Sequence, residues 1–271
     1  MKKSIDTLLV TMIIVTGLSL FLYPTVSNFI TERSGSQAID GYSDNVSGLD
    51  DSLSDAELAR AEEYNAALFR SSVNTEPTAV SQSDYDYMLN ISGDGMIGYV
   101  DIPRINCRLP IYHGTDVKTL ESYIGHLRSS SLPVGGESTH CVLTGHTGMP
   151  SAKLLTDLDS VEVGDRFTLT TLNRKLTYEV NSITVVKPDE TDALKIIRGQ
   201  DLCTLVTCTP YGINTHRLLV RGHRVADAEP VTASLSESFV DVLLHNPIMI
   251  ALAVLLIMLM FTYAVTRINR E

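Results

Sequence analysis

Two long apolar runs lie near the ends of the chain, and shorter apolar stretches fill the region between them. Residues 248–265 carry no charged side chain, and a helix of that length matches the hydrocarbon thickness of a bilayer. Residues 7–30 form a second uncharged run. The pattern therefore predicts a transmembrane helix over residues 247–266. It also predicts an N-terminal segment that is either a cleaved signal peptide or, as we favour, an uncleaved anchor.

Basic residues flank both apolar runs. Lys2 and Lys3 precede the first run, and Arg267 and Arg270 follow the second. By the positive-inside rule, residues 1–6 and 267–271 are then cytoplasmic, and the chain between the two spans lies outside the cell membrane. This is a two-pass arrangement.

Residues 31–90 separate the first span from the region of short strands. Residues 34–52 are rich in Ser, Gly and Asp and predict a polar stalk. Ser54 and Glu57 have the spacing of a capping box, which predicts a helix from Ser54 to about residue 70. Residues 71–90 show no sustained period and are expected to form a loop.

Residues 91–225 have the pattern of a mainly β domain. Short apolar or alternating runs are expected to form strands, with a hairpin over residues 166–186. An apolar stripe predicts a helix over residues 116–128, and residues 192–198 suit a short helical turn. About eight short strands with few helices predict a closed or nearly closed antiparallel barrel. Residues 226–246 form a polar linker to the second span.

Charge and cysteine content narrow the function. A net charge of −11 argues against binding to nucleic acid or, through charge, to an anionic membrane surface. The four cysteines, Cys107, Cys141, Cys203 and Cys208, form no CxxC pair. Cys141 and Cys203 are either neighbours that pair or, as we favour, buried free thiols.

Three reactive side chains stand at the ends of predicted strands. Cys208 follows the apolar run 202–207, Arg217 begins the next strand, and His146 follows the run 141–144 beside a glycine. Cysteine acyl transfer needs a thiolate, an acid-base group and a fixed donor for the oxyanion. The three side chains meet these needs without a metal or an organic cofactor, so we expect neither.

Other interpretations of these residues have less support. Arg221 lies on the same strand face as Arg217 and is its only rival. His140, His216 and His223 with nearby cysteines lack the spacing of a zinc site, and no GxSxG turn supports a serine nucleophile. The acidic residues Asp189, Glu190 and Asp192 are interpreted as a solvated turn rather than a cation site.

The segment TLVTC, residues 204–208, resembles the TLxTC signature of sortases, the cysteine transpeptidases of Gram-positive cell surfaces. Arg217 and LTGH, residues 143–146, fall where sortases carry their catalytic Arg and His, and the likeness extends over about residues 90–225. It implies an eight-stranded sortase barrel. It also implies that Cys208 attacks the Thr-Gly carbonyl of an LPXTG-like sorting signal, Arg217 holds the oxyanion, and His146 protonates the leaving amine before activating the incoming one. We expect Thr207, Thr144 and His216 to form the substrate side of the site.

The blocks GYVDIP, residues 98–103, and LPIYHG, residues 109–114, look most like the class C branch, which polymerises pilins. This resemblance implies LPXTG-type pilin substrates and a pilin lysine as acceptor. Alternatives are a housekeeping sortase that joins surface proteins to peptidoglycan through lipid II, a non-catalytic membrane-anchored binding module, and a purely hydrolytic protease. In class C sortases a lid enters the groove through an Asp-Pro-aromatic motif. Residues 71–90 lack that tripeptide, which leaves both a closed lid and an open loop as interpretations.

Overall fold

The computed structural model describes residues 2–73 and 82–226. The predicted helix over residues 247–266, the linker from residue 227 on and residues 74–81 of the segment 71–90 lie outside these ranges. The chain divides into two compact units, and the boundary falls after Thr31. The barrel and the helices that cover it belong to the larger unit.

The N-terminal helix α1 (Lys2–Ser47) begins with the first apolar run. Many apolar side chains of this run are exposed, Leu20 and Phe21 among them, and none of those described is buried. Among the described residues, α1 alone is long and apolar enough to cross a membrane, as the sequence predicted.

The predicted stalk is wrong for its first part, because α1 continues as a helix to Ser47. Ile39 and Tyr42 are buried and pack with Met96 of the barrel, with Ala38 and Val46 beside them. These positions follow a helical spacing that the surrounding Ser, Gly and Asp residues obscured. The tertiary contact thus outweighs the low helix propensity of the segment.

Helix α2 (Asp51–Val73) begins earlier than predicted. The N–H of Ser52 donates to the carboxylate of Asp50, and the N–H of Leu53 donates to the carbonyl of Asp50, so Asp50 caps the helix. Ser54, the predicted cap, lies inside the helix and is buried. The expected capping box is therefore wrong by one turn.

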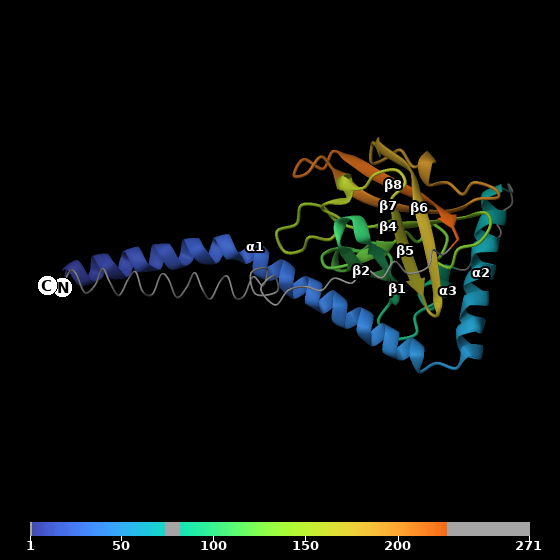
Figure 1. The fold of residues 1–271 in the computed structure, drawn as a ribbon, viewed down its shortest axis with the longest axis horizontal. Coiled ribbons are helices and arrows are strands. Elements are labelled where there is room, and N and C mark those ends of the chain that lie inside the picture. The colour runs from blue at the N-terminus through green and yellow to red at the C-terminus, as the bar shows by residue number, and fades with distance from the viewer. Residues whose placement is uncertain (1, 74–81, 227–271) are drawn as a thin grey trace. The chain divides into compact units, whose positions relative to one another are not determined.

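Eight strands close into a barrel in the order β1-β2-β3-β4-β7-β8-β6-β5 (Figure 1). This confirms the predicted number of strands and the closure. The strands are β1 (Met96–Ile102), β2 (Cys107–His113), β3 (Ile124–His126), β4 (Thr139–Thr144), β5 (Arg166–Thr171), β6 (Arg174–Val186), β7 (Asp201–Thr209) and β8 (His216–Val225). Short helical turns η1 (Pro103–Ile105), α4 (Val117–Leu120), η2 (Leu158–Ser160) and η3 (Asp192–Leu194) connect them.

The sequence predicted an antiparallel barrel, but two of the strand pairs are parallel. β2 pairs with β3, and β4 pairs with β7, in parallel. The helix predicted over residues 116–128 is also wrong: α4 is short, and residues 124–126 form β3. A side chain at Gly125 would strike the carbonyl oxygen of Gly114, so glycine here permits the close approach of β3 to the preceding turn.

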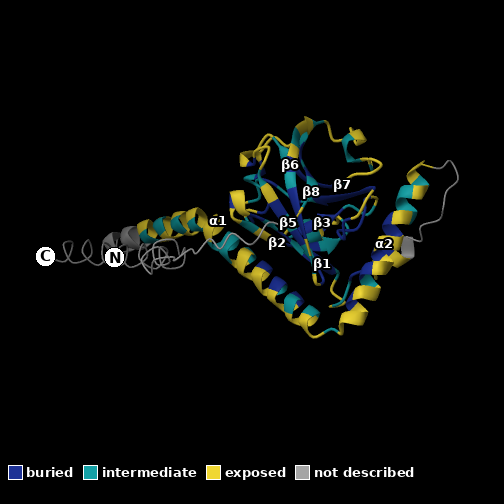
Figure 2. Ribbon diagram, turned by 45° about the vertical axis from the view of Figure 1, so that its right-hand side comes forward, coloured by how far each residue is buried: buried dark blue, intermediate teal, exposed yellow. Residues whose placement is uncertain are grey.

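Buried residues are concentrated on the strands of the barrel (Figure 2), and many of them are large and apolar. Phe167 and Tyr178 stack with ring centroids 5.6 Å apart, and each is at most 1% exposed. Burial of one such side chain contributes roughly 1.5–3 kcal/mol to folding. The interior is therefore a packed core, and any substrate must bind on the outer wall or at an end of the barrel.

Residues 82–90 follow α2 and include the short helix α3 (Gln82–Tyr85). Tyr85 is fully buried, and its hydroxyl lies 2.7 Å from Nδ1 of His126 and accepts the N–H of Gly114 at 3.2 Å. Asp86 next to it forms an ion pair with Arg128 at 2.6 Å. This part of the predicted loop is thus fixed to the barrel by an aromatic anchor without a neighbouring proline.

Candidate active site

Parallel pairing of β4 with β7 brings two distant segments of the sequence together. The register joins Thr144 to Val206, and beyond this pair the N–H of Gly145 donates to the carbonyl of Val206. His146 comes one residue after Gly145, and Cys208 comes two residues after Val206, so both follow closely on this last backbone contact. The two predicted reactive residues therefore leave the barrel wall at the same end, and both are half-buried.

Cys208 and Arg217 are direct partners in the antiparallel pair of β7 and β8. Paired residues of an antiparallel ladder project to the same face, so the thiol and the guanidinium share the outer face of the barrel. Nη1 of Arg217 donates to the carbonyl of His216 at 3.1 Å and to that of Asn214 at 3.4 Å. These bonds orient the planar guanidinium, which carries five N–H donors in all.

The three residues predicted on the substrate side have different settings. Thr207 is buried, and its hydroxyl donates to the carbonyl of Gly145 at 2.8 Å. Thr144 lines a cavity on the outer wall. His216 faces Thr215, whose hydroxyl lies 3.0 Å from its Nδ1. Thr144 is thus the one of the three that the cavity exposes to a ligand, whereas Thr207 joins the His146 segment to the Cys208 strand.

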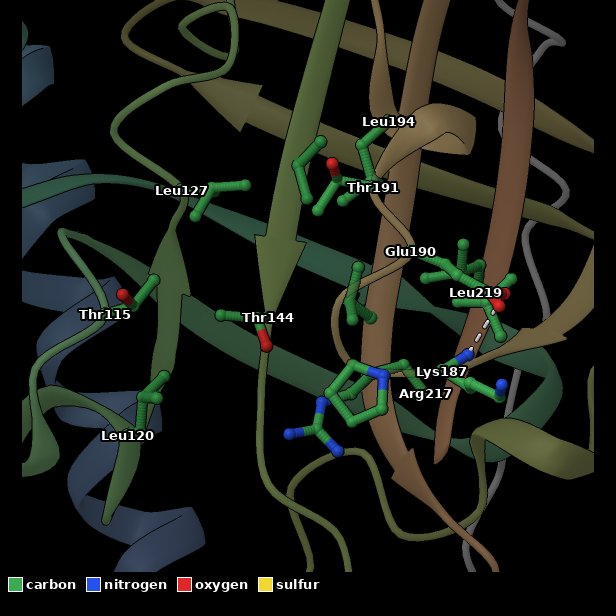
Figure 3. A pocket seen from close by; sticks show the side chains of 14 residues that line it. Thr115, Leu120, Leu127, Thr144, Lys187, Glu190, Thr191, Leu194, Arg217 and Leu219 are labelled. Carbon is green, nitrogen blue, oxygen red and sulfur yellow. Dashed lines mark hydrogen bonds between the residues drawn. The ribbon is translucent and has the colours of Figure 1, made fainter. Parts of the chain in front are cut away.

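A cavity of about 310 Å³ extends along the outer wall from Arg217. Three neighbouring strands each contribute one residue to its apolar floor: Val142 of β4, Val206 of β7 and Leu219 of β8. Figure 3 places Arg217 at one end of the cavity and Thr191 and Leu194 at the other. Because Cys208 lies two residues beyond Val206 on the same strand face, the thiol stands at the Arg217 end.

Sequence patterns did not reveal the walls of this cavity. One wall is the segment after β6, where Lys187, Glu190 and Leu194 contribute, and the other holds Thr115, Leu120 and Leu127. The N–H of Lys187 donates to the carboxylate of Glu190 at 3.3 Å, which helps to fold that segment over the strands. Neither wall has a periodic pattern that would point to a groove.

His140, one of the histidines whose spacing argued against a zinc site, has hydrogen-bond partners of its own. His140 is buried, with Nε2 2.7 Å from the hydroxyl of Thr204 and Nδ1 2.9 Å from the carbonyl of Lys195. Burial lowers the pKa of His140, which keeps its ring neutral. Within residues 2–73 and 82–226, no three His, Cys, Asp or Glu side chains gather closely enough to hold a metal ion.

Cys141 and Cys203 are register partners on β4 and β7, as their equal spacing from His146 and Cys208 had suggested. Both are buried free thiols. Burial raises the pKa of the Cys203 thiol well above its usual range. Cys107 is also free, and burial raises its pKa to about 12. Cys208 alone of the four lies on the outer face beside an arginine partner.

A closed eight-stranded barrel with a thiol, an imidazole and a guanidinium at one end has the features of a cysteine acyl-transfer enzyme. The sortase-domain profile matches residues 100–225. Sortase C1 of Streptococcus agalactiae is a solved structure 49% identical to this chain, with a TM-score of 0.67, and the match covers 71% of this chain and 100% of that one.

Two further relatives agree. A sortase C structure from Streptococcus pneumoniae, described in terms of catalysis and pilin substrate specificity, is 39% identical with a TM-score of 0.64, over 72% of this chain and 100% of that one. Sortase D of Bacillus subtilis is 31% identical over 131 residues, which are 47% of this chain and 63% of that protein. This chain belongs to the sortase family, whose members are cysteine transpeptidases.

Proposed function

We propose that this chain is a class C sortase that cleaves an LPXTG-type sorting signal and transfers the acyl part to a pilin lysine. The observation that carries the proposal is the register pair of Cys208 and Arg217 at the mouth of an apolar cavity. The pairing sets a nucleophile beside a fixed cation, and the cavity offers room for the apolar residues of the signal.

In the proposed first step, the thiolate of Cys208 attacks the carbonyl carbon between Thr and Gly of the signal. The developing oxyanion is held by the Arg217 guanidinium, and His146 gives its proton to the leaving amine. A thioester remains on Cys208. In the second step His146 takes a proton from the incoming lysine amine, which attacks the thioester and releases the joined product.

Two observations support the class C assignment. The solved relatives are sortases C, and their matches reach beyond the barrel into the part of the chain that holds the helices. The solved structures of sortases C from two streptococci match about seven-tenths of this chain and their own full length. These matches therefore extend beyond the matched domain at residues 100–225. A housekeeping sortase with lipid II as acceptor is the alternative, and it would use the same three residues.

We further propose a two-pass arrangement in the cell membrane. Helix α1 supplies one candidate span, and the uncharged residues 248–265 supply the other by composition. The basic residues at both ends place the termini in the cytoplasm and the barrel on the outer face. Residues 1–6 and 267–271 are then cytoplasmic, residues 31–90 and 226–246 are extracellular connections, and residues 91–225 form the catalytic domain.

The test is the intact mass of the protein after incubation with an LPXTG-type peptide. The wild-type chain is expected to gain the mass of the acyl part, and Cys208→Ala is expected to gain nothing. Addition of an amine should release the adduct and yield a peptide-amine product. Release as the free acid alone would identify a hydrolase instead.

The acceptor is tested separately from the thioester. Pilin subunits with and without their lysines, and a lipid II analogue, are offered to the loaded enzyme. Isopeptide formation only with the lysine-bearing pilin supports class C, whereas a product only with the lipid II analogue identifies the housekeeping alternative. If the wild-type chain gains no mass from the LPXTG-type peptide although its Cys208 reacts freely with a small thiol reagent, the proposed sorting signal is wrong.

A further inference from the structure

A second cavity adjoins the first at the end away from Arg217. Its volume is about 470 Å³, and it shares Leu127, Thr191 and Leu194 with the first cavity. Beyond this shared boundary it is lined by Leu68 and Ser71 of α2 and by Ile196 after η3. The two cavities are therefore neighbours across these three residues, and together they extend as a groove from Arg217 to the C-terminal end of α2.

The two-step reaction decides which part of a substrate lies along this groove. The acyl part stays on the enzyme through both steps, while the leaving amine departs and another amine takes its place. Contacts with the acyl part serve both steps, whereas contacts with the leaving part serve only the first, so we assign the groove to the acyl part. Residues N-terminal to the sorting motif then continue past Thr191 and Leu194 into the second cavity.

The wall that α2 contributes is fixed to the barrel before any substrate arrives. The side-chain amide of Asn65 is buried, accepts the N–H of Leu132 at 2.7 Å and donates to the carbonyl of Leu132 at 3.1 Å. Glu62 of the same helix forms an ion pair with Arg174 at 2.6 Å. A preformed wall binds a peptide without a further cost in ordering the protein.

The second cavity has a mixed lining of serine and threonine residues, Lys195 and apolar side chains. The hydroxyl of Ser71 donates to the carbonyl of Leu68 at 2.7 Å, and that of Ser130 donates to the carbonyl of Leu127 at 2.8 Å. Lys195 forms an ion pair with Asp192 at 2.6 Å. Because these polar groups already have partners, we assign the contact with a ligand to the apolar side chains of Leu68, Leu127 and Ile196.

We infer that the second cavity is a subsite for an apolar side chain in the residues just upstream of the sorting motif, on the same substrate. The inference rests on the proposed function, because the direction of the peptide follows from acyl transfer. It assigns part of the substrate preference to α2, which lies outside the matched sortase domain of residues 100–225.

The experiment measures binding rather than turnover, on the full-length chain in detergent with Cys208→Ala. The probes are three fluorescent peptides: Leu-Pro-Ala-Thr-Gly alone, the same motif after Ile-Val-Ile, and the same motif after Gly-Ser-Gly. The peptide with the apolar extension is expected to bind about tenfold more tightly than the other two. Equal affinity for all three peptides would overturn the inference.

Two arginine substitutions on α2 locate the effect. Ser71→Arg fills the second cavity, and the preference for the apolar extension should disappear while affinity for the short peptide stays the same. Ala66→Arg is the matched control, because Ala66 is exposed on the same helix and lines neither cavity. A preference that survives Ser71→Arg, or that Ala66→Arg also removes, contradicts the subsite.

Failure of the proposed function gives a different result. In that case the wild-type chain forms no adduct with the short peptide, and none of the three peptides binds to Cys208→Ala. An adduct with the short peptide together with equal binding of all three leaves the transpeptidase intact and rejects the second subsite alone.

Discussion

The hydroxyl of Thr207 donates a hydrogen bond of 2.8 Å to the carbonyl of Gly145, in the buried space between β7 and the end of β4. The donor directly precedes Cys208, and the acceptor directly precedes His146. One hydrogen bond thus connects the backbone segments that carry the proposed nucleophile and the proposed acid-base group. Its loss would alter their relative position without removing either of them.

Thr207→Val should therefore lower kcat by about tenfold to a hundredfold, because small misplacement of reacting groups is costly, and should change KM little. The buried carbonyl of Gly145 also loses its side-chain donor, at about 1–3 kcal/mol of unfolding free energy. Steady-state kinetics and urea unfolding measure the two effects. Thr207→Ser restores the hydroxyl and should recover most of the activity, and a fully active Thr207→Val would show that the bond does not position the site.

Arg217 and Arg221 share one strand face but differ in setting, and this offers a matched comparison. Arg217→Lys should reduce kcat by about a hundredfold, because a point charge does not reproduce the guanidinium fork toward an oxyanion. Arg221 donates to the side-chain oxygen of Asn181 at 3.5 Å, away from the thiol, and Arg221→Lys should leave kcat within about twofold. Transpeptidation rates of both variants test this. Equal decreases of kcat in the two variants would contradict a specific role of Arg217 at the oxyanion.

His113 gives the fold a dependence on pH. Burial, followed by the nearby charge of His126, lowers the pKa of His113 from 6.5 to about 4. In the unfolded chain, His113 therefore binds a proton as the pH falls below 6.5. In the folded chain it binds that proton only near pH 4. The unfolding free energy should therefore be unaffected by this group above pH 6.5 and should decrease as the pH drops from 6.5 to about 4. Neutral His140, whose pKa is lowered too, acts in the same direction.

The substitution His113→Leu should make the melting temperature less sensitive to pH between 6.5 and 4. Neither ring nitrogen of His113 has a hydrogen-bond partner in the described part of the chain, so leucine forfeits no such bond. Thermal melts of both proteins across this pH range provide the measurement. Identical pH profiles would mean that other groups set the acid sensitivity.

Tyr42 attaches the second half of α1 to the barrel. Its hydroxyl accepts the N–H of Leu172 at 2.8 Å and donates to the carbonyl of Ile97 at 3.3 Å. Tyr42→Phe leaves both backbone groups buried without this partner, and we expect a loss of about 1–3 kcal/mol in unfolding free energy. The exposed Tyr87 provides the control, since Tyr87→Phe should be neutral. Urea unfolding of the detergent-solubilised chain distinguishes the two, and equal stabilities would contradict the attachment.

The sequence predicted elements well where local pattern and tertiary role agree. The hairpin of β5 and β6 was found because apolar and polar residues alternate along β5, where every second residue is buried. The helix predicted over residues 116–128 failed because Gly125 allows a close backbone contact that decides for a strand. The stalk failed because Ile39 and Tyr42 find partners only on the barrel. Neither partner is visible in a local window.

The candidate site divides in the same way. Cys208, His146 and Arg217 were selected by motif and by position at strand ends, and the register brings these strand ends together. The cavity walls were not predicted, because Thr191, Leu194 and Leu127 become neighbours only through the fold. The substrate side of the site is thus built largely from residues whose local sequence carries no signal.

The closed barrel has a consequence for recognition and for the product. In the described part of the chain, every barrel strand has a neighbour on each side, so the sheet offers no free edge to an extended peptide. A sorting signal therefore finds no strand that is open along its whole length, which disfavours strand addition by a peptide or by a protein rich in strands. Recognition depends instead on the side chains of the groove. Substrate choice can thus drift through surface substitutions, with the hydrogen-bonded frame of the barrel unchanged.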